Sequence, residues 1–276
     1  MTALRQFFTS PAAVVGLVIL IAIVVLAVSA DILYPRDPLS LAGRPLIWPN
    51  ANPRFLLGTD PSGRDIAAQI AHGARTTLLM GIVSTLVAIA IGILVGALAG
   101  YYGGLVDDAL MRLTEAFQTL PNFILLLVLV VVVGSNMVAV TFAIGIVSWP
   151  AVARLTRAEF LTLRNREFVQ ACRILGLTDR QIIFREILPN ALAPIIVYGS
   201  VVMATAILLE SALAFLELSD PNIASWGNLI GQGRRVLRSE WYVSAIPGVA
   251  VLLTIFSVSL VGQGLNDALN PRLRGR

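Results

Sequence analysis

The chain has 276 residues, of which 57% are hydrophobic and 13% charged, and a formal net charge of +4. Apolar content this high and charge content this low exclude an ordinary water-soluble domain and indicate an all-α, polytopic membrane protein. The charge is small and spread along the chain, which argues against a nucleic-acid partner, and a single cysteine excludes a disulfide framework or a thiolate metal site.

The first apolar run, residues 12–30, is long enough to cross a bilayer, which takes about 20 residues in a helix. A cleaved signal peptide is the alternative, because Val28-Ser29-Ala30 has the small residues of a cleavage site. The apolar region of a signal peptide is usually about 7 to 15 residues, which is shorter than this run. We therefore interpret residues 1–30 as an N-terminal tail followed by a retained first span.

Residues 31–75 are polar and rich in proline, and they contain no apolar run that could span a membrane. Asp60-Pro61 predicts an Asx-type turn, and Asp65 is placed to start a short helix. His72 stands alone, without a neighbouring Cys, Asp or second His, so it indicates a surface or interface residue rather than a metal ligand.

The second span is predicted at residues 76–99, where Gly92, Gly96 and Gly100 recur at four-residue spacing. Small residues at this spacing favour close helix packing in lipid. The glycine pair that follows, Gly103-Gly104, lies near aspartates, but the chain has no Gly-Lys-Ser/Thr ending of a phosphate-binding loop. We therefore expect that this chain does not hydrolyse ATP.

Two shorter apolar runs, residues 120–134 and 137–152, are separated by Gly134-Ser135-Asn136. Pro121 and Pro150 near their limits predict broken or tilted helices. Further spans are expected at about 191–212 and from Pro247-Gly248 to about residue 262, which gives six spans in all.

Two features of the fifth and sixth spans bear on function. Glu210, near the end of the fifth, either lines a pathway or reaches water at the membrane surface. Trp226, Trp241 and Tyr242 between the two spans are typical of an aromatic belt at a membrane surface.

Residues 164–194 are polar and rich in arginine although apolar runs flank them, and they predict two short helices. Gly176 ends the first, and Thr178 with Gln181 forms a capping box that starts the second. Pro189 and Pro194 mark the return to an apolar run. The first helix would place Phe168, Ala171, Cys172 and Leu175 on one face, and the second would do so with Ile182, Ile183 and Ile187.

This pattern has three interpretations. It is compatible with a DNA-binding helix-turn-helix, with an amphipathic loop on lipid headgroups, or with a docking element that carries force from a soluble partner. The flanking apolar runs hold the segment close to a membrane, which disfavours DNA binding.

The segment resembles the EAA loop of ABC importer permeases, in which Ala-Ala-x-x-x-Gly is followed at a fixed distance by Leu-Pro. Ala171, Cys172, Gly176, Leu188 and Pro189 stand at those spacings. The sequence departs from the pattern in three places: Gln170 replaces Glu, Cys172 replaces the second Ala, and Glu186 replaces a His common in peptide importers.

Four further motifs resemble the C-type permease subunits of peptide and nickel importers. One resembles a cytosolic turn of that family and consists of Gly100-Tyr101-Tyr102-Gly103-Gly104 with Asp107, Met111 and Arg112. Leu57-Gly58-Thr59-Asp60 continuing to Arg64-Asp65 matches a second, and Ser225-Trp226-Gly227 matches a third. The end of the chain matches a fourth except at Asn266 and Asn270, and Leu216-Glu217-Leu218-Ser219 replaces a Leu-Gly-Leu-Gly sequence. The signature residues expected in the outer segment are Gly58, Thr59, Asp60, Gly63, Arg64 and Asp65.

The resemblance implies a type I ABC importer permease with six transmembrane helices. Its partners would be a second homologous permease, one or two ATP-binding subunits, an extracytoplasmic solute-binding protein and the lipid bilayer. ATP and Mg²⁺ would be bound by the ATPase partners, and this chain would hold no cofactor and no metal. Residues about 164–190 would be the coupling helix, with contacts to the ATPase from Glu167, Phe168, Ala171, Cys172, Gly176, Leu177, Thr178, Asp179, Leu188 and Pro189.

Charge predicts the orientation. With both termini in the cytoplasm, the inner segments hold 12 arginines and the outer ones 8, in agreement with the positive-inside rule. Residues 1–30 would then be a cytosolic tail and first span, 31–75 an extracytoplasmic segment, and 76–276 a permease core of five spans in a bacterial inner membrane.

The transported solute stays open between dipeptides, longer peptides, nickel chelates and other small solutes. An ion-coupled secondary transporter is an alternative, but its spans would need ionisable groups, and an intramembrane enzyme would need a catalytic pair or a metal cluster. The predicted spans are nearly free of charge, which disfavours both.

Overall fold

The structure, a computed structural model, describes residues 3–269, which form helices joined by turns and one long irregular segment, residues 34–65. In chain order the elements are α1 (Ala3–Thr9), α2 (Pro11–Leu33), α3 (Ile66–Tyr102), α4 (Gly104–Gln118), α5 (Asn122–Val133), α6 (Met137–Leu163), α7 (Glu167–Ile174), α8 (Asp179–Gln181), the π-helical turn η1 (Ile182–Ile187), α9 (Leu188–Phe215), α10 (Trp226–Gly233), the 3₁₀ turn η2 (Arg234–Val236) and α11 (Tyr242–Leu269).

Within the described residues, five helices are long and apolar enough to cross a membrane: α2, α3, α6, α11 and the continuous run Asp179–Phe215 that contains α9. The remaining predicted span corresponds to α4 and α5, which meet at a bend of 83° and form one crossing only as a pair. The bend lies beside Pro121, where the sequence predicted a broken helix. The prediction of an all-α membrane protein is therefore confirmed, and the predicted six spans are obtained when α4 and α5 are taken as one broken span.

The second span is part of a helix that is much longer than its apolar run. α3 has 37 residues and begins at Ile66, where the Asp65 side chain caps it by accepting a hydrogen bond from Ala67 N at 2.9 Å. The predicted helix start at Asp65 is confirmed, but the predicted short length was wrong, because the helix continues into the second span. Ile66 and Ile70 belong to a buried cluster with Trp226, so tertiary packing continues the helix beyond the apolar run.

α3 and α6 approach each other closely along the row of glycines. A Cβ atom added at Gly92 would lie 2.5 Å from Val152 Cβ, and one added at Gly96 would overlap the carbonyl oxygen of Ala153. The two helix backbones can approach this closely only because glycine has no side chain at these positions. The predicted role of these glycines in helix packing is confirmed.

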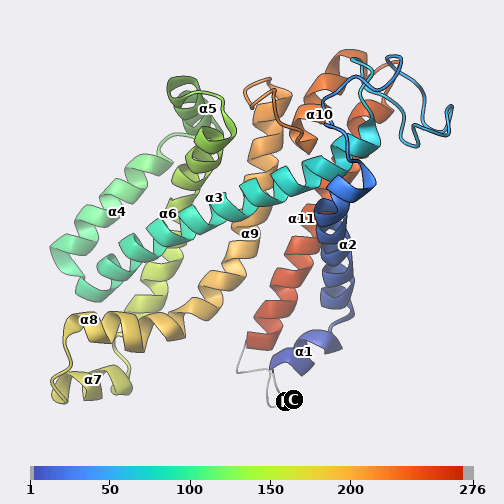
Figure 1. The fold of residues 1–276 in the computed structure, drawn as a ribbon. Helices are drawn as coiled ribbons and strands as arrows, with labels where there is room; N and C mark the ends of the chain where they lie inside the picture. The colour runs from blue at the N-terminus through green and yellow to red at the C-terminus, as the bar shows by residue number, and fades with distance from the viewer. Residues whose placement is uncertain (1–2, 270–276) are drawn as a thin grey trace.

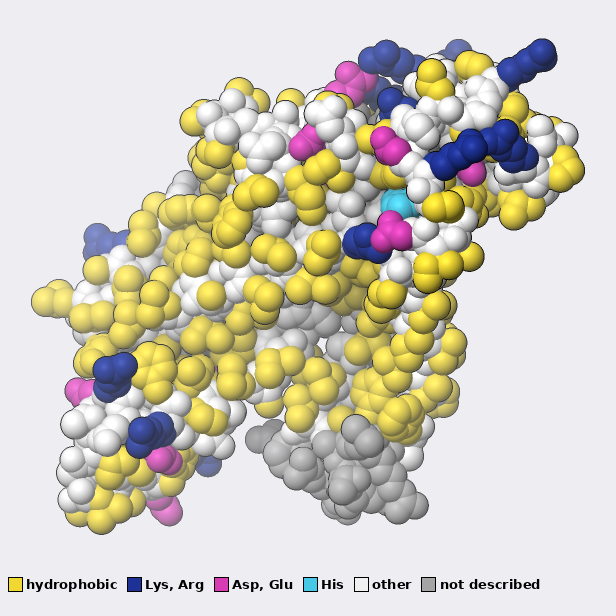
Figure 2. All heavy atoms as spheres, in the orientation of Figure 1, with side chains coloured by type: hydrophobic (Ala, Val, Ile, Leu, Met, Phe, Trp, Pro, Cys, Tyr) yellow, Lys and Arg dark blue, Asp and Glu magenta, His cyan; other side chains and the backbone are white. Residues whose placement is uncertain are grey.

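The molecule has two polar ends. Figure 1 shows α1, α7 and α8 at one end and α10 with the 34–65 segment at the other. We refer to these as the α7 end and the α10 end. On the face drawn in Figure 2, charged side chains gather toward the two ends and apolar side chains cover the surface between them. This distribution suits a protein whose ends lie in water and whose middle lies in hydrocarbon.

Two of the three aromatic residues predicted for a membrane-surface belt are buried inside the protein. Trp226 donates its Nε1–H to the carbonyl oxygen of Ile70 at 2.9 Å, and the Tyr242 hydroxyl donates to the carbonyl oxygen of Ile47 at 3.0 Å. Trp241 alone is exposed, at 55%. The belt prediction was therefore wrong for Trp226 and Tyr242, which tie α10 and α11 to the rest of the α10 end.

Glu210 does not reach water. Its side chain is buried, with 1% of the residue exposed, and one carboxylate oxygen accepts a hydrogen bond from Ser225 Oγ at 2.9 Å. The carboxylate therefore faces neither solvent nor an open pathway. It joins α9 to the residue that caps α10.

Glu217 stands where the related motif has glycine, and its backbone has a φ of +62°. The turn after α9 still forms, because Glu217 N donates to Ala214 O at 2.9 Å and Leu218 N to Leu213 O at 3.0 Å. The Glu217 carboxylate also pairs with Arg235 at 2.8 Å. This departure from the motif changes the residue but keeps the turn.

Candidate coupling surface

Residues 164–190, the coupling segment, form the α7 end of the molecule. α7 ends in a Schellman motif, in which Gly176 N donates to Arg173 O at 3.0 Å and Leu177 N to Cys172 O at 3.1 Å. Gly176 has a φ of +79°, a conformation that side chains disfavour. The prediction that Gly176 ends the first helix is confirmed.

The second helix of the segment begins with the predicted capping box. Thr178 Oγ1 accepts from Gln181 N at 3.4 Å, and the Gln181 side chain accepts from Thr178 N at 2.9 Å. From Gln181 the chain continues through η1 into α9 without a break. Pro189 therefore lies inside a continuous helical run, directly after the π-helical turn η1, and does not separate two elements.

The inward side of the segment is held by isoleucines. Ile182, Ile183 and Ile187 are buried, as predicted, in a cluster that includes Phe160 of α6. Burial of large aliphatic side chains fixes where this part of the chain lies against the bundle.

The apolar face predicted for α7 is mostly directed away from the bundle. Val169 is the fully buried residue of this helix, Cys172 is partly buried, and Phe168, Ala171 and Leu175 are exposed. α7 is only eight residues long, and its apolar side chains lie on more than one side of the helix. Periodicity over so short a helix does not distinguish the side that meets the bundle from the side that meets a partner.

The outward side of α7 carries large apolar side chains. Ile174 is 87% exposed, Leu175 is 77% exposed, and Phe168 is also exposed. We refer to Phe168, Ile174 and Leu175 as the coupling surface. Large apolar side chains exposed at a polar end of a molecule favour a contact site for another protein. Of the other residues predicted to couple, Glu167, Ala171, Gly176, Thr178, Asp179 and Pro189 are exposed, and Cys172, Leu177 and Leu188 are partly buried.

Two residues to which the sequence assigned no coupling role hold the segment to α3. The Tyr101 hydroxyl donates to Asp179 Oδ1 at 2.6 Å. Arg164 Nη1 donates to the carbonyl oxygens of Gly100 and Tyr101 at 3.1 and 3.2 Å. The pairing of Tyr101 with Asp179 joins residues 78 positions apart, so no local pattern in the sequence could have indicated it.

At the α10 end, the signature residues form a tight turn that also bonds to the preceding irregular segment, to α3 and to Tyr242 of α11. Asp60 is buried, and its carboxylate accepts from the backbone N–H groups of Ser62 and Arg64 at 2.8 and 2.9 Å and from Gln69 Nε2 at 3.1 Å. This confirms the predicted Asx turn. Thr59 is also buried, and its Oγ1 accepts from Ile47 N at 2.8 Å.

The rest of the signature completes this turn. Gly58 and Gly63 have positive φ values of +81° and +83°, and the partly buried Asp65 begins α3. Burial raises the pKa of the Asp65 carboxyl, although the backbone N–H groups of Ala67 and Ala68 oppose this shift. The signature Gly58, Thr59, Asp60, Gly63, Arg64 and Asp65 is therefore a folding element of the α10 end.

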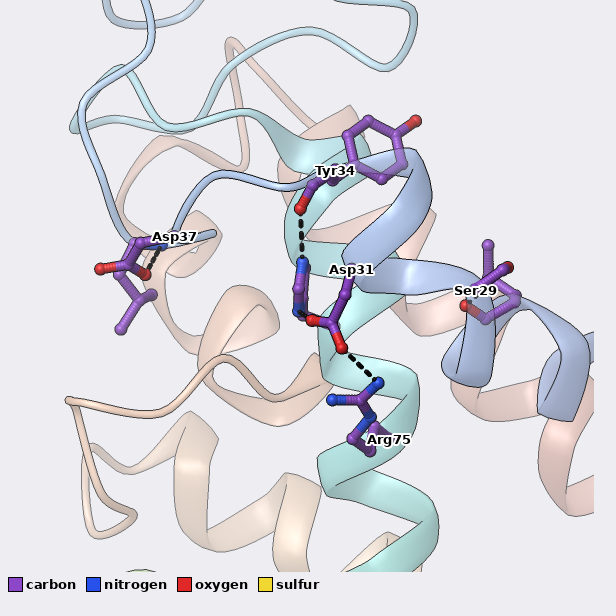
Figure 3. A network of polar contacts seen from close by, with 8 residues as sticks. Ser29, Asp31, Tyr34, Asp37 and Arg75 are labelled. Atoms are coloured by element: carbon purple, nitrogen blue, oxygen red, sulfur yellow. Dashed lines mark hydrogen bonds and ion pairs between the residues drawn. The ribbon is translucent and has the colours of Figure 1, made fainter.

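His72 lies in a polar network that joins α2 to α3. Figure 3 shows Asp31, at the end of α2, bonded to Arg75 of α3, with an Asp31 Oδ2 to Arg75 Nη2 distance of 2.9 Å. His72 Nε2 lies 2.9 Å from the carbonyl oxygen of Tyr34 and must be the donor, because a carbonyl only accepts. The prediction of an interface histidine is confirmed.

Comparisons with known proteins agree with this architecture. The family model described as "Binding-protein-dependent transport system inner membrane component" matches residues 92–275, and that of the "N-terminal TM domain of oligopeptide transport permease C" matches residues 1–53. A Pseudomonas aeruginosa protein named as the di/tripeptide transport permease DppC is 37% identical over 98% of this chain and 91% of its own length.

Other relatives are similar over comparable lengths. The Haemophilus influenzae oligopeptide transport permease OppC is 35% identical over 99% of this chain and 88% of its own. The Pectobacterium atrosepticum glutathione transport permease GsiD is 33% identical over 98% and 90%.

A solved structure shares the fold. A chain of the MetNI methionine ABC transporter, described as inward facing, aligns with a TM-score of 0.61 at 20% identity, over 72% of this chain and 94% of that one. The family model, the full-length relatives and the helical arrangement agree. The chain belongs to the binding-protein-dependent transport system inner membrane components, the multi-pass permease subunits of ABC importers.

Proposed function

We propose that this permease carries peptides, or a related small solute such as a nickel chelate, into the cytoplasm by alternating access. Relatives named for di- and tripeptides, oligopeptides and glutathione support peptides as the transported class. ATP hydrolysis on partner subunits drives the cycle, and the coupling segment receives that motion through the coupling surface. The observation that carries this proposal is the group of exposed apolar side chains on α7.

The proposed assembly contains a second homologous permease, one or two kinds of ATP-binding subunit and an extracytoplasmic solute-binding protein. ATP and Mg²⁺ belong to the ATPase partners, and this chain binds neither a cofactor nor a metal. The ATPase contact is made by Glu167, Phe168, Ala171, Cys172, Gly176, Leu177, Thr178, Asp179, Leu188 and Pro189, with Ile174 and Leu175 of the coupling surface in addition.

Co-purification tests the assembly. The tagged protein, extracted from native membranes in mild detergent, is expected to bring down a second permease and an ATPase, and the identity of any binding protein would narrow the solute. Leu175→Asp is expected to reduce the recovered ATPase strongly, because it places a charge in an apolar contact. Leu41→Asp is the matched control, since Leu41 is 76% exposed at the α10 end and Leu175 is 77% exposed. Recovery of the chain alone, active in liposomes without ATP, would favour an ion-coupled secondary transporter instead.

The proposed orientation places the α7 end and both termini in the cytoplasm and the α10 end outside. The excess of arginines in the inner segments supports it. Cys172 is the only cysteine in the sequence, so single-cysteine variants can be built on Cys172→Ala. In intact spheroplasts, a membrane-impermeant maleimide is expected to label Leu41→Cys and to leave Leu175→Cys unlabelled until the membrane is opened. The reverse pattern would contradict the orientation.

A further inference from the structure

In the part of the chain that the structure describes, the coupling segment bonds to only one helix of the bundle besides the two helices that flank it in the chain. Apart from bonds to its flanking helices α6 and α9, its hydrogen bonds within residues 3–269 all go to the last turn of α3. These are the Tyr101 hydroxyl bond to Asp179 and the two Arg164 bonds to the carbonyl oxygens of Gly100 and Tyr101. The end of α3 is therefore the polar anchor of the segment.

Tyr101 contacts both helices of the segment with one ring. Its hydroxyl reaches Asp179, the first residue of α8, while the guanidinium of Arg173 on α7 lies 5.7 Å from the ring centroid. Tyr101 itself is buried, with 6% exposed. A buried ring that bonds an otherwise exposed carboxylate links the surface of the segment to the interior, and a bond to an ionised acceptor is stronger than a neutral one.

The end of α3 cannot move without its neighbours. Arg157 of α6 forms a bidentate pair with Asp107 of α4, with an Nη2 to Oδ2 distance of 2.6 Å. This fixes the corner between α3 and α4 against α6. A displacement at Tyr101 would act on α3 directly, because Tyr101 lies in the last turn of that unbroken helix.

The far end of α3 lies at the α10 end of the molecule. The helix runs for 37 residues, about 55 Å at helical rise. There Trp226 of α10 is bonded to the carbonyl oxygen of Ile70, and the buried turn around Asp60 precedes its first residue. One uninterrupted helix thus connects the coupling segment to the surface at the opposite end.

We propose that Tyr101 is the positioning residue through which movement of the coupling segment is transmitted to α3, by its hydroxyl bond to Asp179. This inference rests on the proposed function, since it takes the coupling segment as the place where the ATPase acts. It assigns the transmission to one side-chain contact and to one helix.

The test is the number of solute molecules transported per ATP hydrolysed in the complete complex reconstituted in liposomes. Tyr101→Phe keeps the buried ring and removes only the hydroxyl. It is expected to lower this ratio about tenfold, as the loss of one bond to a charged acceptor would. The amount of bound ATPase should stay the same. Asp179→Asn should also lower the ratio; because Asp179 is itself a proposed ATPase contact, its ratio is compared at equal amounts of bound ATPase.

The double variant separates transmission from packing. If Tyr101 and Asp179 act through their mutual bond, Tyr101→Phe with Asp179→Asn should be no worse than the more severe single variant. Tyr102→Phe is the matched control, because Tyr102 is the neighbouring residue, is 51% exposed and undergoes the same chemical change. It should leave the ratio at the wild-type value.

Two contrary results are distinguishable. An unchanged ratio in Tyr101→Phe, with ATPase bound in wild-type amounts, would overturn this inference and leave the proposed function intact. Wild-type transport that proceeds without ATP would overturn both.

Discussion

Replacement of Gly176 by proline is expected to abolish ATP-driven transport while the protein stays in the membrane. Gly176 has a φ of +79°, whereas proline is held near −65°. Proline also removes the N–H that donates to Arg173 O at 3.0 Å. Both changes disrupt the turn that sets the orientation of α7 relative to α8. The coupling surface would therefore point away from the ATPase. The measurement is solute-stimulated ATP turnover of the complex in liposomes.

Alanine variants separate backbone strain from added volume. A Cβ atom at Gly176 meets nothing within 4 Å, and the same is true at Gly248 in α11, where no positive φ is involved. Gly176→Ala should therefore cost about 1 to 2 kcal/mol through strain alone and reduce turnover in part. Gly248→Ala should not change turnover. Normal stimulated turnover in Gly176→Pro would falsify the coupling role of this turn.

Replacement of Gly96 by leucine is expected to prevent stable folding. An added Cβ atom would overlap the carbonyl oxygen of Ala153 and lie 2.6 Å from Thr156 Cβ. The obstacle on α6 is partly backbone, which cannot rotate away, so α3 and α6 would have to separate. Overpacking of this kind costs about 3 kcal/mol or more. The expected result is a large fall in the thermal unfolding midpoint in detergent, or no folded protein.

Gly248→Leu serves as the control for this variant, because it adds the same side chain at a glycine with open space around it. Its unfolding midpoint should remain close to that of the wild type. A Gly96→Leu protein as stable as this control would show that the α3–α6 crossing is looser than the structure indicates.

The sequence predicted the features of the coupling segment that depend on local chemistry. The helix end at Gly176, the capping box at Thr178 and the buried isoleucines each follow from side chains within one or two turns. The sequence did not indicate which side of α7 meets the bundle, because this short helix has apolar residues both toward the bundle and toward solvent. An apolar face that binds a partner protein and an apolar face that packs inside the protein have the same residue composition, so the sequence does not distinguish them.

The remaining errors come from contacts between residues far apart in the chain. The start of α3 and the burial of Trp226 depend on each other, although Ile70 and Trp226 are 156 positions apart. Hydropathy predicts where lipid begins, but it does not predict how far a helix continues when another part of the protein covers it. The contact of Tyr101 with Asp179 was missed for the same reason.

The break between α4 and α5 makes this pair easier to bend than an unbroken helix such as α3. α5 has 12 residues, about 18 Å of helix, so it does not cross a hydrocarbon layer of about 30 Å without part of α4. At the 83° bend the ladder of backbone hydrogen bonds is interrupted, whereas α3 beside it is an unbroken rod. Bending strain in such a pair concentrates at the joint. We therefore expect this part of the bundle to bend at the joint between α4 and α5 rather than within α3.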